Sequence, residues 1–123
     1  MRFMYVISSS APPAAPTPAL LEAMHAMAVR EIAAGRMLAD GGLMPPSMGA
    51  RITCARGKVA VTDGPFAETK EVIAGFAVFE AKDRDEGLAL GVEFMQLHAD
   101  HQPGWNGVME MREIAGSQTR PVR

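Results

Sequence analysis

The 123-residue chain has a single cysteine, Cys54, which excludes an intrachain disulfide and fits a reducing cytosol. It also lacks any apolar run near the roughly 20 residues that cross a membrane. Residues 3–7 are too short an apolar core for a signal peptide. We therefore expect a cytoplasmic protein with no membrane partner, and a Cys54 side chain that serves as a small buried hydrophobe.

An excess of charge of one sign is also missing. Fourteen acidic and twelve basic residues leave a net charge of −2, spread along the chain without a basic stripe. This pattern argues against a nucleic-acid partner. The sequence has no Walker loop, no dinucleotide glycine fingerprint and no nucleophile elbow. We accordingly expect no cofactor.

Apolar spacing and turn residues predict alternating strands and helices. A capping hydroxyl and a proline, Thr17-Pro18, begin the first helix, and Gly35 ends it. Asp83 begins the second helix in the manner of a capping box with Glu86. The predicted strands are residues 3–7, 37–44, 51–55, 58–62, 72–81 and 108–114.

The faces of these elements are predicted from the same spacing. The first helix is expected to bury Leu21, Met24, Ala28 and Ile32, and the second Leu88, Val92 and Met95. Gly87 and Gly91 lie near the second stripe, where close packing on a sheet would offset their low helix propensity.

The element order predicts an α+β fold of ferredoxin-like type, an antiparallel sheet with both helices on one face. We expect one domain over residues 1–115 and a C-terminal tail over residues 116–123. The strands at residues 3–7 and 72–81 are apolar on both faces, whereas two helices cover only one. If the second face were uncovered, its exposed apolar area would be larger than soluble monomers tolerate. We therefore predict a homodimer with its sheets face to face.

The run Thr62-Asp63-Gly64-Pro65-Phe66-Ala67-Glu68-Thr69-Lys70-Glu71 carries most of the chemistry. One interpretation is structural. Glycine allows a positive φ, proline restricts its neighbour, Asp63 closes an Asx-type turn, and Phe66 anchors it. Glu68 and Lys70 are then a solvated charge cluster.

The other interpretation is a site. Asp63 and Glu68 would converge on a pocket as general acid and base, with Lys70 as an anchor for an anionic substrate. Gly64, Pro65 and Phe66 would then line the substrate site.

This run closely resembles the signature of the DGPF group of YCII-related proteins, and Ile73-Ala74-Gly75-Phe76 resembles the strand that follows it there. The resemblance implies a dimeric α/β-barrel fold, a pocket in each subunit and an enzymatic role. In YCII proteins proper it implies a His/Asp pair, for which Asp63 is the acid here. A link of such proteins with alternative sigma factors implies a regulatory role instead.

Three further positions have two interpretations each. His25 is a surface histidine near Glu22, or it leans into the pocket and pairs with Asp63. His98 and His101 favour the end of a helix dipole, and we expect no metal there. Trp105 packs against the body or covers the pocket.

The leading hypothesis is a homodimer that binds a small polar or anionic metabolite and performs cofactor-free acid/base chemistry with Asp63, His25 and Glu68. The alternative is a regulatory module that senses a ligand without catalysis.

Overall fold

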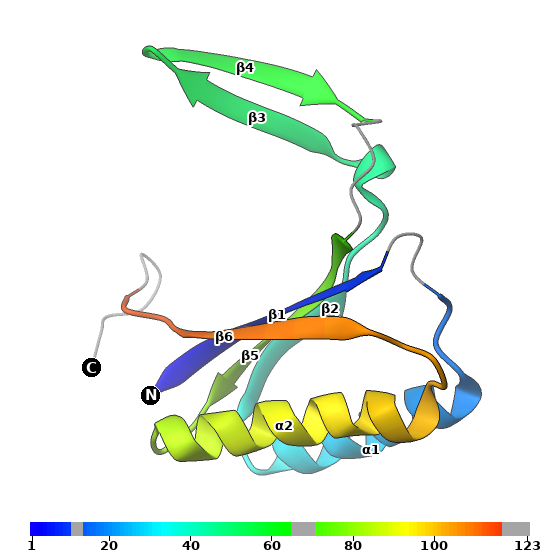
Figure 1. The fold of residues 1–123 in the computed structure, drawn as a ribbon. Helices are drawn as coiled ribbons and strands as arrows, with labels where there is room; N and C mark the ends of the chain where they lie inside the picture. Colours follow the sequence, from blue (N-terminus) through cyan, green and yellow to red (C-terminus); the bar gives the residue numbers. More distant parts are fainter. Residues whose placement is uncertain (11–13, 65–70, 117–123) are drawn as a thin grey trace.

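The computed structural model describes residues 1–10, 14–64 and 71–116 (Figure 1). In this part of the chain the elements are β1 (Arg2–Ser10), α1 (Pro18–Ala33), β2 (Met37–Gly42), a short 3-10 helix η1 (Pro46–Met48), β3 (Ala50–Ala55), β4 (Lys58–Asp63), β5 (Glu71–Glu80), α2 (Arg84–His101) and β6 (Gly107–Glu113). Each predicted strand and helix is present, with ends that differ by a few residues. The predicted tail lies largely outside the described residues.

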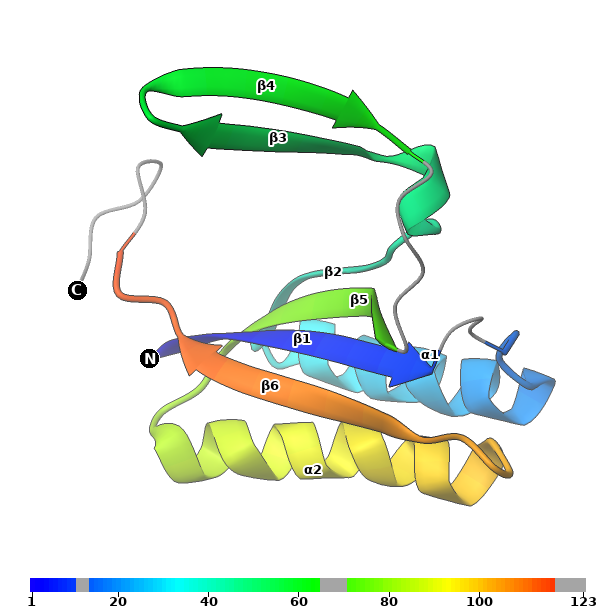
Figure 2. The same ribbon diagram turned by 45° about the horizontal axis from the view of Figure 1, so that its top comes forward.

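Four strands form an antiparallel sheet in the order β2-β5-β1-β6. Both helices lie under the same face of this sheet (Figures 1 and 2). The prediction of an antiparallel α+β fold is therefore confirmed, and the arrangement is compatible with a ferredoxin-like fold. Among the described helices, none is long and apolar enough to cross a membrane.

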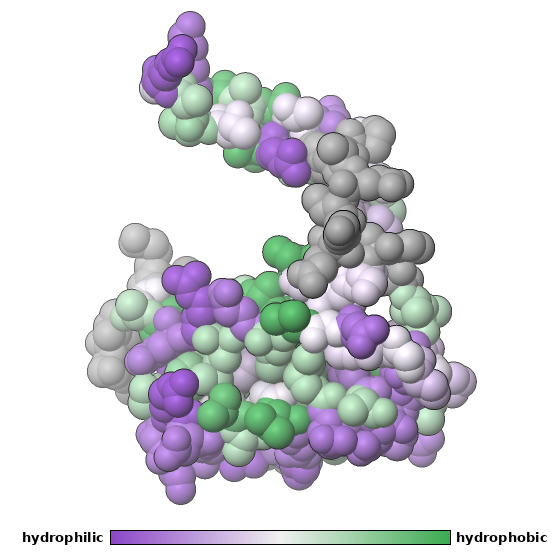
Figure 3. Space-filling view, in the orientation of Figure 1, coloured by the Kyte–Doolittle hydropathy of each residue, from purple (hydrophilic) through white to green (hydrophobic). Residues whose placement is uncertain are grey.

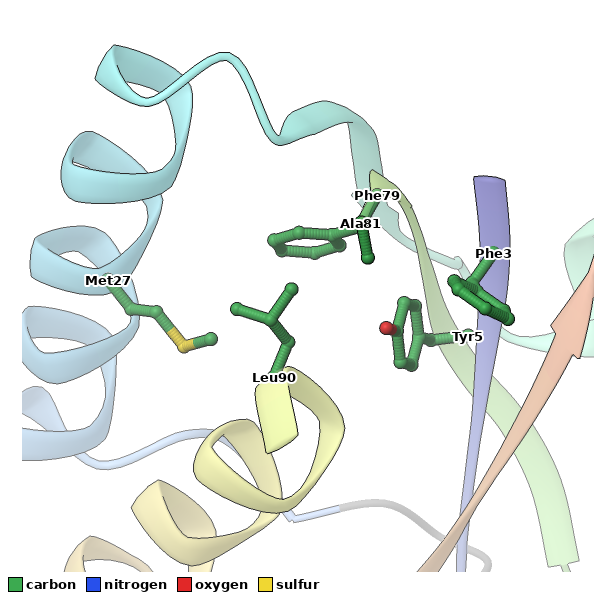
Figure 4. Packing of buried hydrophobic residues seen from close by; sticks show 6 residues of the cluster. All are labelled: Phe3, Tyr5, Met27, Phe79, Ala81 and Leu90. Atoms are coloured by element: carbon green, nitrogen blue, oxygen red, sulfur yellow. The ribbon is translucent and has the colours of Figure 1, made fainter. Parts of the chain in front are cut away.

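The core lies between the sheet and the helices (Figure 4). Alternate residues of β1 point toward the helices, so Phe3 and Tyr5 are buried there. The ring of Tyr5 meets that of Phe79 edge to face, with centroids 5.5 Å apart. Met27 from α1 and Leu90 from α2 complete the contact between the layers.

The buried face of α1 differs from the prediction. The helix buries Leu20, Met27 and Glu31, whereas Leu21 and Ile32 are exposed. A difference of one residue turns a helix by about 100°. Met24 and Ala28 are half-buried. The prediction was wrong for Leu21 and Ile32 because apolar side chains occur on both sides of this helix.

The buried face of α2 was also predicted wrongly, since Leu88 and Val92 are exposed. Gly87 and Gly91 face the sheet instead. A Cβ on Gly87 would lie 2.8 Å from the ring of Phe3, and one on Gly91 would lie 3.2 Å from the ring of Tyr5. The expectation of close packing at these glycines is confirmed, and it decides which face of α2 is buried.

Caps define both helix starts as predicted. The Thr17 hydroxyl accepts a hydrogen bond from the Leu20 amide at 3.1 Å. The Asp83 carboxylate accepts one from the Glu86 amide at 2.8 Å, and the Glu86 carboxylate in turn accepts one from the Lys82 amide.

Glu31 is fully buried at the end of α1. Its Oε1 accepts a hydrogen bond from Nε of Arg36 at 2.6 Å, and its Oε2 accepts bonds from Arg36 and Arg30 at 2.8 Å. Arg30 also binds Glu93 of α2 at 2.7 Å. Because the Arg36 carbonyl accepts a hydrogen bond from the Glu80 amide, this cluster joins both helices to the start of β2 beside β5.

β3 and β4 form a hairpin whose turn has positive φ at Arg56 (53°) and Gly57 (76°), as the predicted tight turn requires. Every residue of the two strands is exposed, so the expectation of a buried Cys54 is wrong. The hairpin is a separate sheet and not part of the main one. Figures 2 and 3 show it as an arm that stands away from the body across a hollow.

Candidate functional site

A cavity of about 420 Å³ lies between the helices and the sheet face that they cover. Most of its lining is apolar and comes from β1, α1, β2, β5, α2 and the start of β6. A volume of this size fits a small organic ligand. It lies beside the core of Figure 4, because Tyr5, Met27, Phe79 and Leu90 contribute to both.

The tyrosine in this wall is a structural group. Its hydroxyl donates a hydrogen bond to the Gly87 carbonyl at 2.6 Å. Burial raises the pKa of Tyr5 to about 12, so the phenol stays protonated and keeps its donor on α2. Tyr5 therefore contributes its aromatic ring to the cavity wall and does not act as a general acid there.

The glycine that follows Asp40 makes room for an aromatic ring on the other face of the sheet. A Cβ on Gly41 would lie 2.9 Å from the ring of Phe76, which comes from the neighbouring strand β5. Phe76 pairs with Val6 of β1, one position from the helix-facing pair of Tyr5 and Ala77. Glycine at this point of β2 thus allows the Phe76 ring to lie over the strand on the sheet face opposite the helices.

A set of hydrogen bonds closes the end of the cavity where α1 begins and α2 ends. The Thr17 hydroxyl donates to the His101 carbonyl at 2.6 Å, and the Thr17 amide donates to the Gln102 side chain at 2.8 Å. The Gln102 side chain also donates to the Ala15 carbonyl at 3.1 Å. These bonds fix residues 14–17 against the end of α2.

Aromatic rings form the neighbouring wall. His98 is buried, and its Nδ1 lies 3.0 Å from the Phe94 carbonyl of the preceding turn. The imidazole lies against Trp105 with ring centroids 4.4 Å apart and against Phe94 at 5.0 Å, with its plane tilted by 39° and 57° to these rings. Trp105 in turn lies directly against Gly107, where a side chain would clash with the indole.

Two ionisable side chains line the cavity from more exposed positions. His25 comes from α1 and Asp40 from β2, and both are largely accessible to solvent. An imidazole and a carboxylate at one cavity are the residue types of general acid/base chemistry. The cavity therefore has an apolar interior and proton-carrying groups in its lining.

Comparison with known proteins places the chain in a family. Residues 1–115 match the YCII-related domain. The chain belongs to the YCII-related family. An uncharacterized protein of Rhizobium meliloti (strain 1021) is 32% identical over 92 residues, which cover 75% of this chain and 70% of that protein.

In this YCII-related chain, the predicted site residues fall in different places. His25 lines the cavity. Asp63 ends β4 at the foot of the arm, is exposed, and is not among the described residues that line the cavity. Pro65, Phe66, Glu68 and Lys70 lie outside the described residues.

Gly64 is described, and its role differs from the expected turn. Its φ is not positive, unlike that of Gly57. Its amide donates to the Gly49 carbonyl at 3.0 Å, and a Cβ would lie 2.6 Å from the Ser47 carbonyl oxygen. Glycine is therefore required here because the end of the arm passes close to the backbone of η1.

Sequence reasoning missed Asp40, and it assigned His98 to the end of a helix dipole and not to a ligand site. Asp40 stands next to Gly41-Gly42, and glycine within a strand marks a close approach of the neighbouring chain. No signal in the sequence shows that His98 faces inward. Within residues 1–10, 14–64 and 71–116, no three His, Cys, Asp or Glu side chains gather as a metal site would require.

Proposed function

We propose that this YCII-related protein binds a small organic molecule in the cavity between its helices and its sheet. The observation that carries the proposal is an apolar cavity of about 420 Å³ with a few polar side chains in its lining. Such a composition is typical of ligand sites, where apolar walls supply affinity and a few polar groups supply orientation.

The lining favours a neutral, mainly apolar ligand over the polar or anionic metabolite expected from Lys70. Among the described residues, no lysine or arginine contributes to the cavity. An anion buried there would lack a permanent countercharge and would lose its hydration. An aromatic or aliphatic molecule would instead pack against Tyr5, Phe94 and Met27.

Acid/base catalysis without a cofactor is the activity that we propose for this site. His25 and Asp40 share the cavity lining, which supports Asp40 as the partner carboxylate of His25. We also propose membership of the DGPF group, because residues 62–71 carry its signature. Catalytic roles for Asp63 and Glu68 stay predictions. In the alternative function, the same cavity senses a ligand for a regulatory protein and carries out no reaction.

Thermal shift tests the ligand class. Two sets of compounds of similar size, neutral aromatics and small carboxylates or phosphates, are compared on the wild type. We expect only the neutral set to raise the melting temperature, by a few degrees at saturating concentration.

Paired variants show whether these compounds bind in the cavity. Ala28 lines the cavity, whereas Ala26 on the same helix is exposed and does not. Ala28→Phe should fill the space and weaken binding by about tenfold or more, while Ala26→Phe should bind as the wild type does. Equal binding by both variants, or stabilisation by the anionic set, would contradict the proposal.

Asp63→Asn tests the role of the signature aspartate. Because Asp63 ends the arm strand and asparagine can make the same turn contacts as aspartate, we expect unchanged binding of cavity ligands and a change in stability of no more than about 0.5 kcal/mol. Melting temperature and ligand titration are measured on the same sample. Loss of binding in a fully stable variant would instead support Asp63 as a group of the site.

We also propose a homodimer, in the manner of dimeric α/β barrels. Two apolar surfaces support it. On the sheet face opposite the helices, Met4 and Val108 are exposed. On the arm, Ile52 pairs with Val61, and these side chains are 71% and 65% exposed. Figure 3 shows hydrophobic surface on both the arm and the body beside the hollow. A second copy would cover both surfaces at once, since a lone two-stranded hairpin is marginally stable.

A further inference from the structure

The inner part of the cavity contains polar side chains whose hydrogen-bonding capacity is already used. The Tyr5 hydroxyl donates to the Gly87 carbonyl, and the amide of Gln102 both donates to Ala15 and accepts from Thr17. These groups orient the walls. They have little left with which to recognise a ligand.

His98 is different because only one of its ring nitrogens is used. The side chain is 7% exposed, and Nδ1 lies 3.0 Å from the Phe94 carbonyl. A carbonyl can only accept, so Nδ1 carries a proton, and in the tautomer with this single proton Nε2 is an acceptor. Among the described residues Nε2 has no partner, yet it is not one of the buried polar atoms that are sealed from solvent. His98 is one of the residues that line the cavity.

Ser9 adds a second polar group to the same lining. It is 3% exposed on β1 and pairs with Gly107, the residue on which Trp105 packs. Its hydroxyl has no hydrogen-bond partner among the described residues and is likewise not sealed from solvent. Trp105 therefore touches both His98 and the strand position beside Ser9.

A polar atom at an apolar cavity that has only solvent as a partner can bind a matching ligand atom in place of the solvent. The two neighbouring rings and Gly107 fix the imidazole, so the acceptor is held in place before a ligand arrives. The ring of a ligand would pack against the apolar walls, while a hydrogen-bond donor on that ring would bind Nε2 of His98.

We infer that the cavity recognises an aromatic molecule bearing a neutral hydrogen-bond donor, a phenol-like hydroxyl, which donates to Nε2 of His98 with Ser9 as a second polar contact. This inference rests on the proposed function and specifies its ligand class. It assigns a binding role to His98, which belongs neither to the signature run nor to the proposed acid/base pair of His25 and Asp40.

Phenol and fluorobenzene test the inference, because they have nearly the same shape and only phenol can donate. Their dissociation constants are measured calorimetrically on the wild type and on His98→Phe, which keeps an aromatic ring at this position. We expect the preference for phenol over fluorobenzene to fall about tenfold in the variant. Ser9→Ala should reduce the same preference to a lesser extent.

Imidazole nitrogen NMR gives a readout that does not depend on a folded variant. In the wild type, phenol should shift the Nε2 signal of His98, and fluorobenzene should not. The absence of a Nε2 shift, or an equal preference in the wild type and His98→Phe, would overturn the inference. In that case binding of both compounds would leave the proposed function intact. Binding of neither compound to the wild type would contradict both proposals.

Discussion

Replacing Glu31 with alanine should lower the free energy of unfolding by about 2 to 4 kcal/mol. The carboxylate is fully buried and accepts three hydrogen bonds from Arg36 and Arg30. Its removal leaves two guanidinium groups without their shared partner at the junction of α1 and β2. Both arginines are partly exposed, with side chains 35% and 51% accessible, so water can solvate them and the loss stays below that of a sealed ion pair.

Chemical denaturation measures this loss, with Glu22→Ala as the matched control. Glu22 belongs to the same helix and is exposed, so its replacement should change stability by no more than about 0.5 kcal/mol. Equal effects of the two substitutions would show that the cluster contributes nothing beyond helix propensity.

The difference in stability between the wild type and Glu31→Ala should depend on pH. Hydrogen bonds from Arg36 hold the pKa of Glu31 below the ordinary glutamate value of 4.5. A lowered pKa in the folded state means that ionised Glu31 stabilises the protein above about pH 4.5 and that this contribution is lost as the pH falls through the lowered value. The stability gap between wild type and Glu31→Ala should therefore narrow in acid. A gap that stays constant to low pH would contradict the role of the charge.

Placing two aspartates on the apolar face of the arm should convert the proposed homodimer to a monomer. Ile52 and Val61 are directly opposite each other, and each exposes about two thirds of its side chain or more. If a partner covers this pair, the double variant Ile52→Asp/Val61→Asp buries two carboxylates without countercharges. We expect the dissociation constant of the dimer to rise at least about a hundredfold.

Light scattering after gel filtration reports the change. The wild type should elute with twice the chain mass of 13.1 kDa at micromolar concentration. The control is Thr53→Asp/Ala60→Asp, because these residues form the neighbouring cross-strand pair on the opposite face of the arm. The control should remain a dimer. A monomeric wild type would refute the homodimer. A monomeric control would show that charge on either face of the arm disrupts the dimer, and would contradict a specific role of the face with Ile52 and Val61.

Local features of the fold followed from the sequence because they depend on neighbouring residues. The caps at Thr17 and Asp83 satisfy amides of their own first turns. The hairpin turn at Arg56-Gly57 needs only a residue pair that tolerates positive φ. The element order then restricted the fold to an antiparallel sheet with crossing helices.

The candidate site was predictable in part. His25 was singled out, and it lines the cavity. The carboxylate in the same lining is Asp40, which was not predicted and is far in the sequence from the predicted site residues. Local spacing cannot reveal such a pair, because β2 reaches the cavity only through its register with β5.

The sequence by itself determined the helix starts, the hairpin turn, the order of the elements and the α+β class, all of which depend on short-range sterics and hydrogen bonding. Only the tertiary structure decided which helix faces are buried, because that choice depends on distant partners. Glu31 turns inward because Arg36 and Arg30 neutralise it there, and α2 presents Gly87 and Gly91 because aromatic rings of β1 occupy the space beside them. The cavity exists for the same reason. Its walls come from six elements, and their side chains meet only after the sheet has formed and both helices have packed on it.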